Sequence, residues 1–370
     1  MQAVAEISMM AVRENYLSIR RVLPPRSHLI CVLKANAYGH GALPLGRLYS
    51  SFGEVSFAVA HLQEGIALRE GGITAPILLL GHLTGTEVQE ALAYHLTPSI
   101  HSLTQAKGLS RGAGALGLSL TVHLKLDSGM GRLGFRCDSA KEVEEAMEVL
   151  SLPYLEVTGV YTHFARADVG DAGQAFTALQ YNRFTTVANV LDRVAHHHLF
   201  RHTGNSGALL DYPSFCEEGV RVGILLYGVH PSKEVRHPLP LTPVMTLKTP
   251  IIHIKEVPAG TPIGYGGAYI TSCPCRIATL PIGYGDGIHR LWGDLGLTVT
   301  LKGIPCPLVG RVCMDSCTID VSGVPNVHLG DEVVFFGRGS IHVATVAERC
   351  QTIPYEILSG IGGRVARVYI

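Results

Sequence analysis

The hydrophobic positions in the first two-thirds of the chain follow two spacings. Met9, Val12, Tyr16 and Ile19 recur at the spacing of an amphipathic helix. Short continuous apolar runs of strand length alternate with such helical segments. The runs are Leu29–Leu33, Ser56–Ala60, Pro76–Leu80, Leu96–Ile100, Leu120–Leu126, Leu155–Thr162, His198–Thr203 and Gly219–Tyr227. Continuous apolar strands separated by helices predict a parallel sheet that is covered on both faces. About eight of them favour a closed (β/α)₈ barrel, and the alternative is an open doubly wound sheet.

The hydrophobic pattern changes near residue 237. Residues 237–243 read HPLPLTP, which is a proline-rich connector that fits neither a central strand nor a helix interior. Short β-rich runs with turn signals follow it, including Thr298–Leu301 and Glu332–Phe336. We therefore predict two domains, a barrel over residues 1–237 and a smaller, mainly β domain over residues 238–370.

Composition limits the classes of partner. The 370 residues contain 30 basic and 30 acidic side chains, so no net charge favours nucleic acid or an anionic membrane. The N-terminal residues do not resemble a signal peptide, no uncharged run is long enough to span a bilayer, and we expect a cytoplasmic protein. Nine scattered cysteines favour reduced thiols. Although Cys273, Cys275, Cys313 and Cys317 are conceivable metal ligands, their spacing does not repeat a zinc-knuckle pattern and we expect no metal site.

Polar residues follow the predicted strands at their carboxyl ends, where barrel enzymes place their reactive groups. Taken alone, each of these residues is better explained by an ordinary turn, core or ion-pair role, but together, at successive strand ends, they favour a site. They are Lys34, Lys125, Asp127, His163, His202, Asn205, Ser206 and Arg221. Residues 112–117 (GAGALG) also match a dinucleotide-binding pattern. Because they precede a strand instead of following one, we interpret them as a loop between a helix and a strand.

Lys34 carries the most specific signal. It ends an apolar run, where desolvation favours the neutral amine that a Schiff-base-forming lysine needs. Residues 32–41 read VLKANAYGHG, which resembles the pyridoxal 5′-phosphate (PLP) attachment segment of the alanine racemase family. The resemblance covers almost the whole chain. It implies the (β/α)₈ barrel with a β-rich second domain, PLP held covalently by Lys34, alanine as substrate, a homodimer, and D-alanine supply for peptidoglycan.

Further blocks of the chain resemble cofactor-binding segments of the same family. Residues 122–134 (VHLKLDSGMGRLG) imply that Lys125, often carbamylated in the family, orients Arg132 towards the phenolic oxygen of the cofactor and the substrate. Residues 161–164 (YTHF) imply that His163 stacks on the pyridine ring, and residues 221–224 (RVGI) imply that Arg221 reaches the pyridine nitrogen. The phosphate ligands implied in this way are Tyr38, Ser206, the backbone amides of Gly223 and Ile224, and Tyr355.

Two blocks of the second domain resemble family segments that complete the active site. Residues 264–267 (GYGG) imply that Tyr265 is the second catalytic base, supplied by the partner subunit. Residues 311–315 (RVCMD) imply that the backbone amide of Met314 meets the substrate carboxylate. Because racemisation needs a proton donor and acceptor on each face of Cα, the resemblance assigns one face to Lys34 and the other to Tyr265.

Arg221 bears on the choice between PLP reactions. A guanidinium only donates hydrogen bonds, so it leaves the ring nitrogen neutral, which favours racemisation over reactions that need a stronger electron sink. We therefore predict a PLP-dependent alanine racemase. The alternatives are a racemase of broader or different specificity, a decarboxylase on the same two-domain plan, and a non-catalytic PLP-binding protein.

Overall fold

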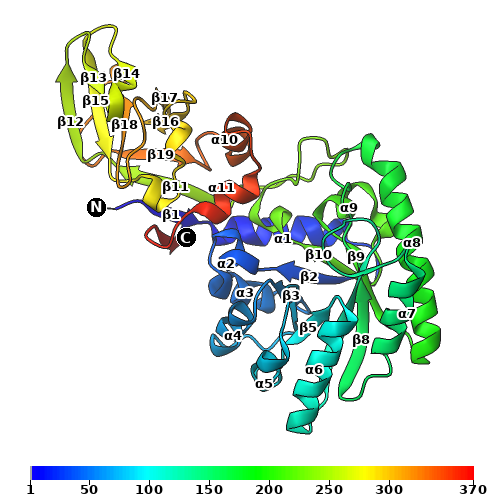
Figure 1. Cartoon of the computed structure of the whole chain (residues 1–370). Coiled ribbons are helices and arrows are strands. Elements are labelled where there is room, and N and C mark those ends of the chain that lie inside the picture. Colours follow the sequence, from blue (N-terminus) through cyan, green and yellow to red (C-terminus); the bar gives the residue numbers. More distant parts are fainter. Residues whose placement is uncertain (1) are drawn as a thin grey trace.

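The computed structural model describes residues 2–370 and contains a closed parallel barrel (Figure 1). Its strands are β2 (His28–Val32), β3 (Ser56–Val59), β4 (Ile77–Leu79), β5 (Thr97–Ile100), β6 (Leu120–Asp127), β8 (Leu155–Tyr161), β9 (Phe200–Gly204) and β10 (Gly219–Val222). Neighbours follow the order β5-β4-β3-β2-β10-β9-β8-β6, and a β5–β6 pairing closes the ring. The predicted (β/α)₈ barrel is confirmed, and the open-sheet alternative was wrong.

Helices surround the barrel and bury their apolar faces against it. They are α1 (Met9–Val22), α3 (Ala42–Ser51), α4 (Leu62–Glu70), α5 (Val88–Ala93), α6 (Leu103–Leu116), α7 (Ala140–Val149), α8 (Asp171–Ala195) and the short α9 (Ser206–Asp211). Serine side chains cap several of these helices: Ser8, Ser102 and Ser139 each accept a hydrogen bond from a backbone N–H of the first turn. No helix of residues 2–370 is both long and apolar enough to cross a membrane.

The glycine-rich residues 112–117 depart from the prediction. Residues 112–116 belong to helix α6, and only Gly117 leaves the helix, as a left-handed cap with φ of 65°. The prediction of a loop was wrong because these glycines serve close packing. A Cβ on Gly112 would lie 2.4 Å from the carbonyl oxygen of Gly85, so only glycine lets α6 approach the segment before α5.

The remainder of the chain is mainly β, as predicted. Its elements are β11 (Met245–Pro250), β12 (His253–Val257), β13 (Pro262–Ile263), β14 (Tyr269–Ile270), β15 (Cys275–Leu280), β16 (Thr298–Leu301), β17 (Ile304–Pro307), β18 (Cys317–Asp320), β19 (Glu332–Phe336), α10 (Val343–Arg349), α11 (Pro354–Gly360) and β20 (Ala366–Tyr369). Together with β1 (Val4–Ile7), these strands form a six-stranded sheet of order β17-β16-β19-β11-β1-β20, a three-stranded sheet of order β12-β15-β18, and the pair β13-β14.

The first strand, β1 (Val4–Ile7), lies in the six-stranded sheet and not in the barrel. It pairs antiparallel with β11 and parallel with β20, so both ends of the chain lie at the junction between the two parts (Figure 1). The hydrophobic pattern did not indicate this strand. The division of the chain at residue 237 stays a prediction, and these four residues belong to the second sheet although they precede the barrel.

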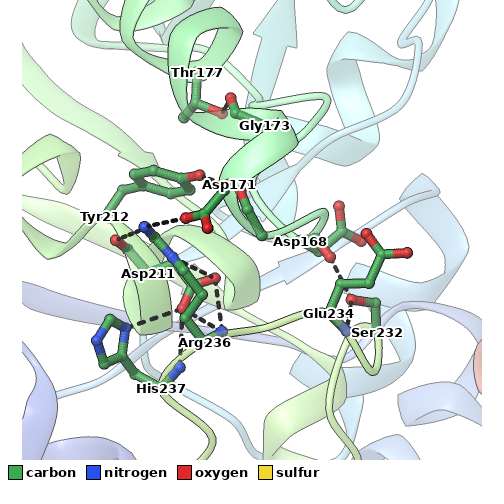
Figure 2. Close-up of polar contacts among 11 residues, drawn as sticks. Asp168, Asp171, Gly173, Thr177, Asp211, Tyr212, Ser232, Glu234, Arg236 and His237 are labelled. Atoms are coloured by element: carbon green, nitrogen blue, oxygen red, sulfur yellow. Dashed lines mark hydrogen bonds and ion pairs between the residues drawn. The ribbon is translucent and has the colours of Figure 1, made fainter.

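A polar cluster fixes the start of the proline-rich connector on the barrel (Figure 2). The buried carboxylate of Asp211 accepts hydrogen bonds from the backbone N–H groups of Arg236 and His237 at 2.9 and 3.1 Å. The guanidinium of Arg236 pairs with Asp171 at 2.9 Å and lies over the ring of Tyr212. These contacts tie the connector to the start of α8 and the end of α9, at the same end of the barrel as the cavity described next.

Candidate active site

A cavity of about 510 Å³ opens at the carboxyl ends of the barrel strands. Ten of the twelve site residues that the family resemblance implies line it. They are Lys34, Tyr38, Lys125, Arg132, His163, Ser206, Arg221, Gly223, Ile224 and Tyr355. Of the three other strand-end candidates, Asn205 lines the cavity, whereas Asp127 and His202 do not. Tyr355 comes from α11, so the far end of the chain also contributes to the wall. The parallel strands bring these residues together because all their carboxyl ends point to one rim.

Lys34 lies two residues after the end of β2 and starts an unusual turn. The next four residues, Ala35–Tyr38, all have φ between 52° and 55°, which is a left-handed turn that costs non-glycine residues about 1–2 kcal/mol each. Glu64 holds this turn, since its carboxylate accepts from the Ala35 N–H at 2.6 Å and from the Ala60 N–H at 2.7 Å. Such strain is maintained only where the surroundings impose it, which is typical of functional sites.

Three cationic side chains face the cavity beside Lys34: the buried Lys125 and Arg221, and the exposed Arg132. Burial and the nearby Arg132 guanidinium lower the pKa of Lys34, so its neutral amine is more accessible than in water. Burial lowers the pKa of Lys125 to about 7, with the positive charge of Arg221 acting in the same direction. Among the ion pairs of residues 2–370, none includes Lys34, Lys125, Arg132 or Arg221. The cavity is therefore electropositive and suited to an anionic ligand.

Arg221 is fixed by neutral acceptors. Its guanidinium donates to the backbone carbonyls of His202 and Thr162 at 2.5 and 2.6 Å, and to ring nitrogens of His202 and His163 at 2.9 and 3.3 Å. Burial lowers its pKa to about 10, so it remains protonated at neutral pH. Burial also holds the pKa of His163 well below its usual range, which keeps this ring neutral against the guanidinium.

Hydroxyl and amide donors gather at another side of the cavity. The rings of Tyr38 and Tyr355 lie 5.7 Å apart, and the Gly223 N–H donates to the Ser206 hydroxyl at 3.3 Å. A Cβ on Gly223 would lie 2.5 Å from the Tyr38 hydroxyl, so glycine is required for this approach. Burial raises the pKa of both tyrosines, which keeps their hydroxyls protonated as donors. This donor set fits a phosphate group.

The two predicted residues of the second part do not line the cavity. Tyr265 starts a short helical turn, η4 (Tyr265–Gly267), and is 68 % exposed, while Met314 is 53 % exposed. Both belong to one region, because Gly264 lies against the backbone of Arg311, three residues before Met314. Within one chain, the structure thus keeps this region apart from the other ten residues.

Two histidines extend the site behind Arg221. His202, a strand-end candidate, contacts Arg221 at 2.9 Å, and His123, for which the sequence predicts no role, contacts His202 at 2.9 Å. The sequence feature that could have pointed to both residues is a histidine within an otherwise apolar strand. No group of three or more potential metal ligands is found in residues 2–370.

Comparison with known proteins identifies the family. The model "Alanine racemase, N-terminal domain" matches residues 7–231, and "Alanine racemase, C-terminal domain" matches residues 244–369. The chain belongs to the alanine racemase family. Membership confirms the resemblance drawn from the motifs, and with it a PLP-dependent isomerase.

Relatives match this family member over their full length. The alanine racemase of Desulforamulus reducens is 42 % identical, with 99 % of this chain and 98 % of that protein covered. Among solved structures, alanine racemase from Clostridium difficile 630 superposes with a TM-score of 0.94 at 37 % identity, covering 100 % of this chain and 96 % of the other. Alanine racemase from Bacillus anthracis with bound L-Ala-P gives 0.93 at 35 % identity, covering 100 % and 95 %.

Proposed function

We propose that the chain interconverts L- and D-alanine by two bases, Lys34 and Tyr265, with PLP bound in the barrel cavity of a homodimer. The observation that carries the proposal is the position of Lys34. It lies just beyond the carboxyl end of barrel strand β2, in an electropositive cavity, beside a group of neutral phosphate-type donors and a buried arginine that no carboxylate neutralises. Full-length similarity to alanine racemases supports the assignment.

The residues present fit the cofactor. Tyr38, Ser206, Tyr355 and the amides of Gly223 and Ile224 would hold the phosphate, and Lys34 would hold the aldehyde carbon. His163 would lie against the ring, with Arg221 at its nitrogen and Arg132 at its phenolic oxygen. When bound, PLP withdraws electrons from the Cα of the amino acid and so acidifies its hydrogen.

Lys34 serves first as the attachment point and then as a base. Its lowered pKa increases the fraction of neutral amine, which is the form that attacks carbon and accepts a proton. The left-handed turn and Glu64 fix the backbone immediately after it, which limits where the amine can move. By the family resemblance, Lys34 exchanges the proton of the D-enantiomer.

Tyr265 is assigned to the opposite face and to the partner subunit. In one chain its side chain is largely exposed and outside the cavity, so an active site that uses it needs a second copy. The partner subunit's Tyr265 would exchange the proton of the L-enantiomer beside His163 and Arg221. The backbone amide of Met314 from the same region would bind the substrate carboxylate.

Arg221 favours racemisation over other reactions at this site. Because a guanidinium has no lone pair to accept a proton and stays charged, Arg221 would donate to the ring nitrogen of the bound cofactor and leave it unprotonated. The cofactor would then withdraw fewer electrons, which would favour prompt return of the proton to Cα. A decarboxylase would use an acidic residue here, and a non-catalytic PLP carrier would have no use for Tyr265 or Met314.

The test measures interconversion of L- and D-enantiomers across a panel of amino acids with added PLP. We expect alanine to react fastest, and we expect no loss of carboxylate carbon as CO₂. Comparable rates for many amino acids would favour the broad-specificity racemase. Absence of interconversion for every amino acid, with PLP bound, would refute a racemase and favour the non-catalytic alternative.

A further inference from the structure

A chain of hydrogen bonds leads from the cavity into the barrel interior. Arg221 on β10 contacts Nδ1 of His202 on β9 at 2.9 Å, and Nε2 of His202 contacts Nδ1 of His123 on β6 at 2.9 Å. His202 is fully buried and Arg221 is 4 % exposed. His123 does not line the cavity, so any effect it has on the site must pass through His202.

The donor-only chemistry of arginine fixes every proton along this chain. Because guanidinium N–H groups only donate, Nδ1 of His202 must be the acceptor. Burial, with the charge of Arg221, holds the pKa of His202 well below its usual range, so the ring is neutral and carries its single proton on Nε2. That proton is donated to Nδ1 of His123. Burial lowers the pKa of His123 to about 4, so His123 is also neutral and carries its proton on Nε2.

The backbone is shaped around His123. The β6–β8 register shifts between Val122 and His123, which is the kind of irregularity that re-aims a side chain. The residue opposite is Gly159, where a Cβ would lie 2.7 Å from Nε2 of His123. The glycine therefore provides the space in which the imidazole lies against the neighbouring strand.

His202 is held on its face as well as its edge. The ring of Tyr161 stacks on it at 4.5 Å with an interplanar angle of 10°, and the Tyr161 hydroxyl donates to Ser99 at 2.7 Å. With its plane fixed by Tyr161 and its proton position fixed by the two neighbours, His202 presents one lone pair to one guanidinium nitrogen. This ring contact, together with the hydrogen bonds to the carbonyls of His202 and Thr162, orients the planar guanidinium.

We propose that His123 is a positioning residue, which accepts the Nε2 proton of His202 and thereby holds the lone pair of His202 on Arg221. The proposal rests on the proposed place of Arg221 at the cofactor ring, and it extends that site by two residues, His202 and His123, beyond the cavity wall. Its expected consequence is a His202 ring held in the one orientation that accepts from the Arg221 guanidinium.

The first experiment reads the proton positions directly. Holoenzyme labelled with ¹³C and ¹⁵N in histidine is examined by solid-state NMR at neutral pH, and the signals of His123 and His202 are assigned by loss in His123→Phe and His202→Asn. We expect both rings to be neutral with the proton on Nε2. A proton on Nδ1 of His202 in the native holoenzyme would overturn the proposal. This readout does not depend on racemase activity.

The second experiment separates hydrogen bonding from packing. His123→Phe keeps ring volume but removes the acceptor, whereas the amide oxygen of His123→Asn occupies the position of Nδ1 and can accept. We expect kcat to fall about tenfold in His123→Phe, the value of one net hydrogen bond, with a shifted cofactor absorption band. His123→Asn should keep most of the native kcat and an absorption band close to the native one.

The exposed His253 on β12 provides the control, because His253→Asn should change neither kcat nor the spectrum. Equal losses in His123→Phe and His123→Asn, with the His202 tautomer unchanged, would reduce His123 to a packing residue and contradict the proposal. Failure of the proposed function would appear differently, as native holoenzyme that lacks racemase activity while the histidine tautomers are as expected.

Discussion

The barrel and the second part contribute to the site in opposite ways. Ten predicted site residues line one cavity within a single chain, and most of them are buried. Arg221 is already held there by hydrogen bonds to neutral acceptors. Tyr265 and Met314 are exposed, lie outside that cavity and are placed by glycine-rich turns. In the proposed function, one chain would therefore assemble the cofactor site alone, whereas the second base would have to come from another copy.

The largest expected effect concerns the barrel half of this comparison. Lys34→Ala removes both the attachment point and one base, so we expect racemase activity to fall by about 10⁴-fold or more. In the native protein, borohydride treatment and peptide mapping should leave the cofactor on the peptide that contains Lys34. Lys107→Ala, at an exposed lysine, is the control: it should retain racemase activity and should still carry the cofactor on the peptide that contains Lys34. Recovery of the cofactor on any other lysine would contradict the assignment.

The next prediction concerns Tyr265, which belongs to the second part of the chain. Tyr265→Ala should reduce deuterium exchange at Cα of L-alanine by about 10²–10⁴-fold and that of D-alanine much less, since each base serves one enantiomer. Exchange is followed separately from each enantiomer, with Tyr154→Phe on the barrel as a control. Equal losses from both enantiomers would favour a single shuttling base.

Mixed subunits sharpen the same prediction. When inactive Lys34→Ala and Tyr265→Ala proteins exchange subunits, one of the two sites in each heterodimer should be whole, and activity should return. Subunit exchange is verified by mass spectrometry of the intact assembly. Activity that stays absent after verified exchange would show that each site is built within one chain, which would remove the contrast between the two parts.

A smaller, pH-dependent effect concerns the buried charge of the barrel. The pKa of Lys125 is lowered to about 7 in the folded chain from an ordinary value of 10.5. The unfolded chain therefore binds an extra proton between about pH 7 and pH 10, and the stability cost of Lys125 is complete below pH 7 and vanishes as pH rises through this window.

Lys125→Met should accordingly raise Tm most near pH 6 and progressively less towards pH 9. The measurement uses CO₂-depleted buffer, because carbamylation would consume the neutral amine. The exposed Lys107→Met should shift Tm equally at all pH values. A stabilisation by Lys125→Met that did not change with pH would show that Lys125 is not a titrating buried amine.

The smallest effects distinguish two barrel glycines. Gly159→Ala places a methyl group 2.7 Å from His123 and should cost about 1–3 kcal/mol of unfolding free energy. Gly108→Ala, within helix α6 and with no atom near its Cβ position, should gain about 0.5–1 kcal/mol. Denaturant unfolding measures the free energy of unfolding of both variants. Similar changes in both would mean that the barrel interior relaxes around His123.

The barrel could be predicted from the sequence because its strands are short, continuous apolar runs that alternate with helical segments. Strand β1 could not, since four residues carry little periodicity and their partners β11 and β20 lie more than two hundred residues further along the chain. The glycines of α6 were misread because their role is a close approach to Gly85, which is visible only in three dimensions.

The same distinction holds for the site. Lys34, Lys125 and Arg221 stand at strand ends where the fold predicts chemistry. His123 lies inside a strand, and its position towards His202 depends on a register shift that no residue pattern announces. Tyr265 and Met314 lie in turns, and only family resemblance marked them as more than a turn aromatic and a core methionine.

The placement of β1 also has a consequence for how the chain folds. Its partner strands contain residues 245–250 and 366–369, so the six-stranded sheet has one of the longest sequence separations that this chain allows. During synthesis from the N-terminus, all the barrel strands can emerge and pair before β20, one of the two partners of residues 4–7, has been synthesised. Contacts of such high contact order form slowly, which makes docking of β1 a late step of folding. Until that step is complete, two strand edges of the second sheet stay open to pairing with other chains.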